Sequence, residues 1–230
     1  MRLSHPILSS PLLLREDVVP VLVLEDPCVF RKLVFELSEQ AAGASGDFTL
    51  SQNFEPLDCA EHLHVLRDYL SFPLDDRSLL HRFQSRLQWT IRELLGSETD
   101  RLQQEICAYL QSVSAATDWP ICFSEGEYIL PLLKALRCQP VLDGSSLLER
   151  LLQYLELYCG LMKDQCFVLV NAHLYFSARE LSELFRMSRY EKWRLLLIEQ
   201  QLPASLPEES VCLIDAQLCE LRLDSVSQTE

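Results

Sequence analysis

The stretch VLVLEDPCVFRKLVFEL, Val21 to Leu37, passes within a few residues from a continuous apolar run to a mixed apolar and charged pattern. Val21–Leu24 has the length and composition of a strand that is covered on both faces, as strands of parallel sheets are. Val29–Ser38 follows at once with the pattern of a helix. The stretch therefore predicts a strand that leads directly into a helix, which is the repeating unit of α/β folds.

Three more short apolar runs have the same character as Val21–Leu24. They are Cys166–Val170, Leu195–Ile198 and Val211–Ile214. A second helix is predicted over Ala178–Ser188, where Ser177 and Glu180 have the spacing of a capping box. Two stretches near the N-terminus, Leu8–Leu14 and Phe48–Leu50, are candidates for edge strands.

The middle of the chain, from about Asp58 to Gly160, is dominated by helical periodicity. Leu79, Phe83 and Leu87 begin one apolar stripe, and Gly96 follows that stripe as a helix stop. The sequence therefore predicts an α/β head formed by residues 1–58 and 161–230, into which a mostly α-helical leg of residues 59–160 is inserted.

Charge and cysteine content narrow the functional class. The 230 residues carry a formal net charge of −14, which argues against a generally basic nucleic-acid binder and against adhesion to an anionic membrane. The nine cysteines form no CxxC pair, as expected for reduced thiols of a cytosolic protein. No export signal or membrane span is recognisable, so we expect a soluble, cytoplasmic protein.

The strand–helix junction lacks the chemistry of a phosphate loop. Such a loop needs glycines and a lysine, but the junction reads Glu25-Asp26-Pro27, and none of the six glycines forms GxxxxGK or GxGxxG. The predicted strand Cys166–Val170 ends at Asn171, where a phosphoryl-transfer enzyme would carry a metal-binding aspartate. We therefore expect no bound nucleotide, no catalytic residues and no enzymatic activity.

Several segments together resemble one protein family. VLVLEDPCVFRKLV and FVLVNAHLYFSARELSELF resemble the first and second strand–helix segments of the CRISPR-associated adaptation protein of type II-A systems, in its short form. RLLLIEQQ and SVCLIDAQL resemble its last two strands, and LLKALRCQP resembles the end of a leg helix. Length, strand order and helical insertion agree as well, so the resemblance spans most of the chain.

The resemblance implies a fold and a function. The head would be a degenerate P-loop or RecA-like domain that has lost its nucleotide site. Four copies would form a ring that encloses double-stranded DNA, loads at free ends and ignores sequence. Calcium held by acidic leg residues would keep the ring competent for DNA. The role would be acquisition of new CRISPR spacers, alongside the adaptation integrase and the effector nuclease.

DNA binding without base readout depends on phosphate contacts, so an acidic chain must gather its cations on one face. The richest basic stretch is RELSELFRMSRYEKWR, and smaller groups lie beside the first strand–helix junction and at a leg-helix end. The candidate DNA-binding residues are Arg31, Lys32, Lys134, Arg137, Arg186, Arg189 and Lys192. Each of them could equally be an ordinary solvated or salt-bridged surface charge.

The resemblance places calcium on the segment TDWPICFSEGEYILPLLK, where Asp118, Glu125 and Glu127 are the candidate ligands. The corresponding segment of the family is more densely acidic, which weakens the expectation of calcium. Ser124 and Glu127 also have the spacing of a capping box, which would give Glu127 a structural role instead.

Two other functions stay open on the sequence alone. The chain could be a degenerate ATPase-like subunit that binds other proteins and makes no direct DNA contact. A weaker alternative is a working nucleotidase with an unusual phosphate site.

Overall fold

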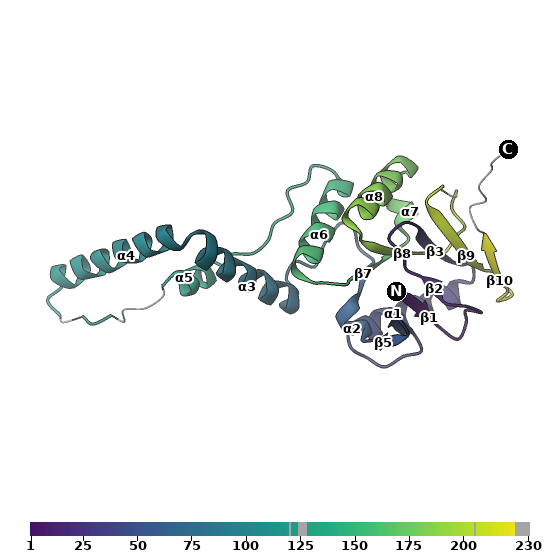
Figure 1. The fold of residues 1–230 in the computed structure, drawn as a ribbon, viewed down its shortest axis with the longest axis horizontal. Coiled ribbons are helices and arrows are strands. Elements are labelled where there is room, and N and C mark those ends of the chain that lie inside the picture. The colour runs from purple at the N-terminus through teal and green to yellow at the C-terminus, as the bar shows by residue number, and fades with distance from the viewer. Residues whose placement is uncertain (120, 124–127, 205, 224–230) are drawn as a thin grey trace. The chain divides into compact units, whose positions relative to one another are not determined.

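The structure is a computed structural model that describes residues 1–119, 121–123, 128–204 and 206–223. The chain divides into two compact units (Figure 1). The head unit comprises Met1–Phe72 and Asp143–Glu230, and the leg unit comprises Pro73–Leu142.

The head unit is built on a six-stranded sheet with the order β10-β9-β3-β8-β7-β6. Its strands are β3 (Val19–Leu24), β6 (Leu63–Leu66), β7 (Cys166–Val170), β8 (Arg194–Glu199), β9 (Glu209–Ile214) and β10 (Glu220–Leu223). All neighbours pair in parallel except β10, which pairs antiparallel with β9. The α/β class is thereby confirmed, and the four strands predicted from apolar runs are confirmed with it.

A second, antiparallel sheet in the head unit has the order β2-β1-β4-β5. It consists of β1 (Arg2–Ser4), β2 (Leu12–Leu13), β4 (Thr49–Gln52) and β5 (Glu55–Leu57). The candidate edge strands Leu8–Leu14 and Phe48–Leu50 contribute to β2 and β4 of this second sheet; β2 is at its edge, whereas β4 lies between β1 and β5.

Helices cover both faces of the main sheet. Helix α1 (Pro27–Ala41) packs on one face, where Leu33 and Leu37 share a core with Leu22 and Ile198. Helix α6 (Leu147–Leu161) packs on the other face, where the ring of Tyr158 lies 5.6 Å from that of Phe167. Helix α8 (Ala178–Glu191) lies beside α6, and the single-turn helices α2 (Cys59–His62) and α7 (Ala172–Tyr175) precede β6 and follow β7 (Figure 1).

The leg unit contains the helices α3 (Arg77–Leu94), α4 (Gly96–Ala116) and α5 (Ile129–Ala135). The predicted stripe from Leu79 to Leu94 lies on α3, and the expected stop at Gly96 is confirmed to within two residues. Gly96 is also the first residue of α4. Among the described residues, no helix is long and apolar enough to cross a membrane.

The unit boundaries differ from the predicted ones at residues 58/59 and 160/161. The structure places them after Phe72 and after Leu142. Leu63–Leu66 is not helical but forms the edge strand β6, paired in parallel with β7. Helix α6 buries Leu151 and Leu155 in the head core, so its periodicity reflects packing against a sheet.

The nine cysteines are all free, as the absence of paired spacings predicted. Burial raises the pKa of Cys166 in β7 to about 12, so this thiol is inert at neutral pH. Cys28, Cys122 and Cys219 are exposed.

Candidate nucleic-acid interface

Helix α8 positions three of the predicted DNA-binding residues. Its start is fixed by the predicted capping box, in which the Glu180 carboxylate accepts a hydrogen bond of 2.8 Å from the Ser177 backbone N–H. Its apolar stripe faces the core, so Arg186 and Arg189 lie on the exposed side. Lys192 caps the C-terminus with φ = 58°, a left-handed conformation that ends the helix.

A groove at the C-terminal end of α8 has a volume of about 500 Å³. The residues that line it come from the N-terminal segment, from the end of α8 and from the start of β8. They are Met1, Leu14, Arg15, Glu16, Asp17, Arg189, Lys192 and Arg194. Four of these eight side chains are cationic and two are acidic, so the groove is basic on a protein that is acidic as a whole.

Ion pairs divide the cations of this groove into two kinds. Arg15 pairs with Asp17 at 2.8 Å, and Arg194 pairs with Glu16 at 3.1 Å. Within the described part of the chain, neither Arg189 nor Lys192 forms an ion pair, so their charges are available to an external anion.

Two titratable groups that line the groove, Asp17 and the Met1 ammonium, have lowered pKa values. Hydrogen bonds from Arg15 lower the pKa of the Asp17 carboxyl, and the charge of Arg189 adds to the effect. Burial and the charge of Arg194 lower the pKa of the Met1 ammonium. Neighbouring cations contribute to both shifts, but burial is the larger cause at Met1 and the Arg15 hydrogen bonds are the larger cause at Asp17.

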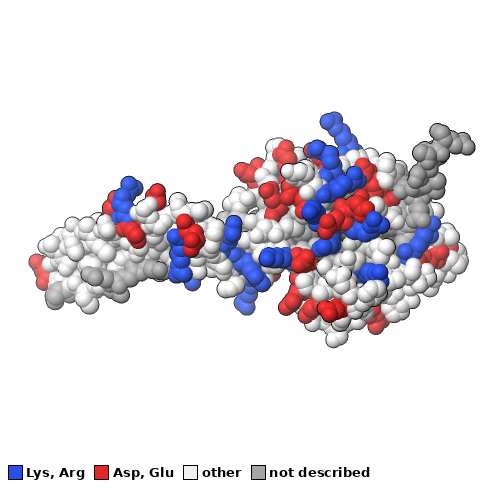
Figure 2. Space-filling model, in the orientation of Figure 1, with Lys and Arg blue, Asp and Glu red and all other residues white. Residues whose placement is uncertain are grey.

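Arg186 lies one turn before Arg189 on α8, and its side chain is 74% exposed. Its guanidinium is 3.9 Å from Glu183, a surface pair that constrains it little. Figure 2 shows Lys and Arg side chains gathered over α8, with acidic side chains among them.

The predicted residues Arg31 and Lys32 are exposed on α1. Arg31 points toward its own helix start, with its guanidinium 3.3 Å from the Pro27 carbonyl. Helix α1 covers the face of the sheet opposite to α6 and α8, so one head unit does not bring this pair onto the surface of Arg189.

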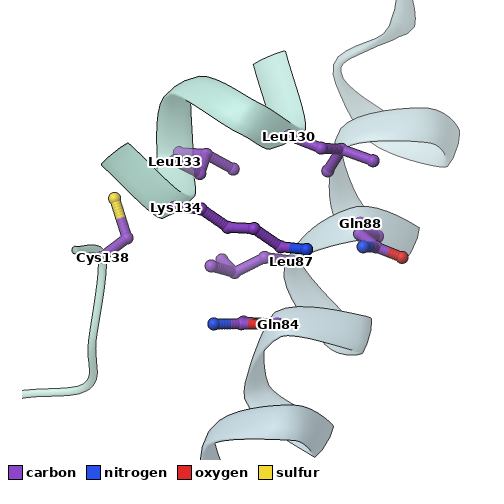
Figure 3. Close-up of a pocket in the computed structure, with 7 residues that line it drawn as sticks. All are labelled: Gln84, Leu87, Gln88, Leu130, Leu133, Lys134 and Cys138. Atoms are coloured by element: carbon purple, nitrogen blue, oxygen red, sulfur yellow. The ribbon is translucent and has the colours of Figure 1, made fainter. Parts of the chain in front are cut away.

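The predicted residues Lys134 and Arg137 belong to the leg unit. The Lys134 stem lies over α3 near Leu87 and Gln88, where α5 and α3 enclose a cavity of about 20 Å³, about the size of one water molecule (Figure 3). Arg137 follows the end of α5 with φ = 52° and is exposed. The seven predicted residues are therefore all exposed; within the head unit, those on α1 and those at α8 lie on different faces of the sheet.

The positions where a phosphate site would lie are occupied by the chain itself. The Asp26 carboxylate accepts hydrogen bonds of 2.7 Å and 2.9 Å from the N–H groups of Cys28 and Val29 at the start of α1. These are the donors that a phosphate would need. Asn171, at the end of β7, has φ = 55° and accepts a bond from the Gln200 N–H through its side-chain oxygen.

Of the predicted calcium ligands, Asp118 lies just beyond the end of α4 and is exposed. Glu125 and Glu127 lie outside the described residues, as does the capping box of Ser124 with Glu127. The predicted ligand set therefore stays a prediction.

Elsewhere in the described residues, one group of three potential metal ligands lies close together: His5, Glu36 and Asp47. The His5 ring accepts a hydrogen bond from the Ile7 N–H at Nδ1, which places the ring proton of a neutral His5 on Nε2. Nε2 lies 3.7 Å from Glu36, and the Asp47 backbone N–H donates to the same carboxylate. The arrangement suits a hydrogen-bonded group better than a metal site.

Sequence reasoning missed a buried polar cluster formed by His173, Glu199 and Glu209. Its members lie at a helix start and at the ends of two strands, up to 36 residues apart, and no motif links them. The only signal in the sequence is a glutamate at each of two strand ends, which is too common to indicate a site.

The fold and its surface define a class: an α/β protein with a largely parallel sheet, a helical insertion and a strand–helix junction whose first helical N–H groups are capped by Asp26. Comparison with known proteins identifies the family. The sequence model of the CRISPR-associated protein family Cas_Csn2 matches residues 40–218, and the chain belongs to this family. The resemblance drawn from the sequence is thereby confirmed.

A solved structure supports the same fold. The chain is similar to Stu0660 of Streptococcus thermophilus, with a TM-score of 0.55 and 11% sequence identity. The match covers 97% of this chain and 76% of that one. At this identity the likeness concerns the fold.

Proposed function

We propose that this CRISPR-associated protein binds the ends of double-stranded DNA without regard to sequence, as a ring-shaped homotetramer that supports spacer acquisition. The integrase and the effector nuclease of the adaptation machinery are the proposed partners. The single observation that best supports DNA contact is the α8 groove, where Arg189 and Lys192 form no ion pairs with the described residues.

Net charge sets the conditions for this function. A chain of charge −14 repels DNA at long range, so contact depends on a local surplus of cations. Each phosphate neutralised releases condensed counterions, and the logarithm of the binding constant falls by about 0.9 per phosphate per decade of salt. A closed ring accommodates both charges, because it can turn a basic surface inward and an acidic one outward.

The proposed activity is non-catalytic and needs no nucleotide. Asp26 supports this part, since its carboxylate already satisfies the N–H groups at the start of α1 and would repel a phosphate there. Calcium held by Asp118, Glu125 and Glu127 remains part of the proposal on the strength of the family resemblance.

The test is a gel-shift comparison of linear and covalently closed duplex DNA, at low and high salt, with calcium or a chelator. We expect binding to linear duplex only, weakened by salt, and a loss on chelation if calcium is required. Binding of both DNA forms would contradict end loading.

A pair of variants identifies the surface. Arg189→Gln with Lys192→Gln removes two cations that form no ion pair with the described residues, and we expect the salt slope to fall by about 1.8 for each protomer that contacts phosphate through both. Arg101→Gln on α4 is the control, because Arg101 lies outside the groove and is paired with Glu105, and we expect little change. An unchanged slope in the double variant would exclude the α8 groove as the DNA surface.

The second candidate function is the ATPase-like interaction subunit. It predicts a stable oligomer or partner complex and no shift of either DNA form at low salt. The nucleotidase alternative predicts that ATP raises the melting temperature, as any ligand of the folded state must.

A further inference from the structure

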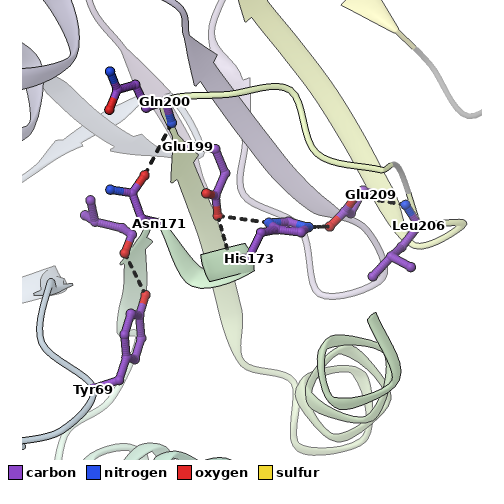
Figure 4. A network of polar contacts seen from close by, with 8 residues as sticks. Tyr69, Asn171, His173, Glu199, Gln200, Leu206 and Glu209 are labelled. Carbon is purple, nitrogen blue, oxygen red and sulfur yellow. Dashed lines mark hydrogen bonds and ion pairs between the residues drawn. The ribbon is translucent and has the colours of Figure 1, made fainter. Parts of the chain in front are cut away.

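His173 is held between two buried carboxylates on the α8 face of the main sheet (Figure 4). Its Nδ1 lies 2.9 Å from Glu199 at the end of β8, and its Nε2 lies 3.1 Å from Glu209 at the start of β9. Side chains alternate between the two faces of a sheet along each strand. The apolar even-numbered residues of β8 and β9 pack in the core under α1; they are Leu196, Ile198, Cys212 and Ile214. The odd-numbered Glu199 and Glu209 therefore both lie on the opposite face. The ring therefore bridges two strands that are separated by β3.

The cluster carries an excess of negative charge. Burial by itself would lower the pKa of His173, but the hydrogen bonds and charges of the two carboxylates raise it to about 9. These contacts favour the imidazolium form of His173, so one cationic ring faces two carboxyl groups. Glu199 is 3% exposed and Glu209 is fully buried, so solvent screens this excess poorly.

A cavity of about 450 Å³ opens beside the cluster, at the carboxyl ends of β7 and β8. This edge is where open α/β sheets bind their ligands. Glu199 and His173 contribute polar groups, and Leu174, Phe176, Leu202 and Leu206 form apolar walls. Leu174 at the rim is 77% exposed, so the apolar surface continues to the mouth of the cavity.

Glu199 has hydrogen-bonding capacity left for a ligand. Both of its hydrogen bonds in the described structure, to the backbone N–H and to the Nδ1 of His173, use Oε1. The second oxygen, Oε2, has no hydrogen-bond donor among the described residues. A carboxylate can accept from a planar, two-pronged donor such as a guanidinium, and it favours a charged donor over a neutral one.

We propose that this cavity binds an organic cation, a guanidinium or ammonium group on an aliphatic stem, with Glu199 as its anchor. The charge of the cluster selects a cation, and the apolar walls receive the stem. A calcium ion fits poorly, because it needs six to eight oxygen ligands, several of them carboxylates, and Glu199 is the one carboxylate among the described residues that line the cavity. The volume lies in the range of small-ligand sites. The proposal does not depend on DNA binding.

The test uses butylguanidinium and its uncharged isostere butylurea, titrated at low salt and pH 7 by NMR or calorimetry. We expect butylguanidinium to bind at millimolar concentration and butylurea to bind at least about tenfold more weakly, because only the former makes a charge-assisted hydrogen bond. Equal affinities, absence of binding, or preferential binding of calcium at this site would overturn the proposal.

Three variants locate the site. Glu199→Gln should abolish the preference for the cation. Glu209→Gln removes the same charge from the cluster but does not line the cavity, so it should weaken binding less than Glu199→Gln does and should keep a preference for the cation over butylurea. Ala178 lies at the mouth of the cavity, at the exposed start of α8. Ala178→Trp should therefore block binding without changing the charges of the cluster. This variant tests the proposal even if Glu199→Gln does not fold. Undiminished binding in Ala178→Trp would place the ligand elsewhere.

A second ligand distinguishes whether the bound cation is a free small molecule or a side chain of a protein partner. A capped pentapeptide with one central arginine presents the same guanidinium from a protein backbone. Competition between this peptide and butylguanidinium would indicate a side chain of a protein partner. Binding of butylguanidinium alone would indicate a free small molecule.

Discussion

Helices α6 and α4 look alike in sequence but differ in what they bury. Both carry an apolar stripe at helical spacing, and α4 is the longer, with 21 residues against 15. Helix α6 buries five residues, whereas α4 buries none. Apolar residues at helical spacing therefore predict that a segment is a helix, but they do not predict how much of that helix its neighbours bury.

The same contrast separates the two units. The strands β3 and β7 are buried at every position, while α3 and α5 of the leg unit bury one residue each. The apolar stripe of the leg leaves Leu94, Leu95, Leu102 and Tyr109 largely exposed. We therefore expect substitutions in the head unit to cost much more stability than equivalent ones in the leg unit.

The largest effect is expected for His173→Ala in the head unit. It leaves Glu199 and Glu209 buried without their cation, which should lower the free energy of unfolding by about 3–5 kcal/mol. Urea unfolding followed by circular dichroism measures it. His81→Ala on the exposed surface of α3 is the control, with a change within about 0.5 kcal/mol. Similar losses in both variants would remove the contrast between the units.

A smaller loss is expected for Leu155→Ala in α6. Leu155 is fully buried, so its truncation removes apolar contacts and leaves a cavity. The free energy of unfolding should fall by about 3 kcal/mol. A loss below about 1 kcal/mol would show that α6 is not part of the head core.

The pH dependence of stability isolates the charge of His173. Its pKa is about 9 in the folded state, against 6.5 for an unperturbed histidine, so its stabilisation is complete below pH 6.5 and is lost as pH rises through 9. We expect a loss on the order of 2 kcal/mol between about pH 6 and pH 9.5. His173→Gln has no titrating ring, so its free energy of unfolding should lack this pH-dependent loss. Subtracting the variant's free energy of unfolding from that of the wild type at each pH cancels the contributions of Met1 and the cysteines. A flat difference would contradict a protonated His173.

The smallest effect is expected for Leu102→Ala in α4, which repeats the chemistry of Leu155→Ala at a 41% exposed position. The free energy of unfolding of the monomer should change by less than about 1 kcal/mol. A loss as large as that of Leu155→Ala would show that α4 buries this residue in solution, and the contrast between α4 and α6 would fail.

Much of the head could be predicted from sequence because local patterns decide it. Strands buried on both faces must be continuously apolar, so β3, β7, β8 and β9 stand out. Strand β6 does not, since Leu63-His64-Val65-Leu66 is short and stands between helical stretches. Its identity depends on pairing with β7, about 100 residues later, and no local pattern records a distant partner.

The candidate sites show the same division. The sequence by itself determined the exposed cations of α8 and the capping box at the start of that helix, because helical periodicity and side-chain capping act over a few residues. Only the tertiary structure decided that Arg15 and Arg194 are paired while Arg189 and Lys192 have no ion pair among the described residues, and that His173 meets Glu199 and Glu209. Those relations arise where strands far apart in the chain meet, and charge pairing depends on distance in space.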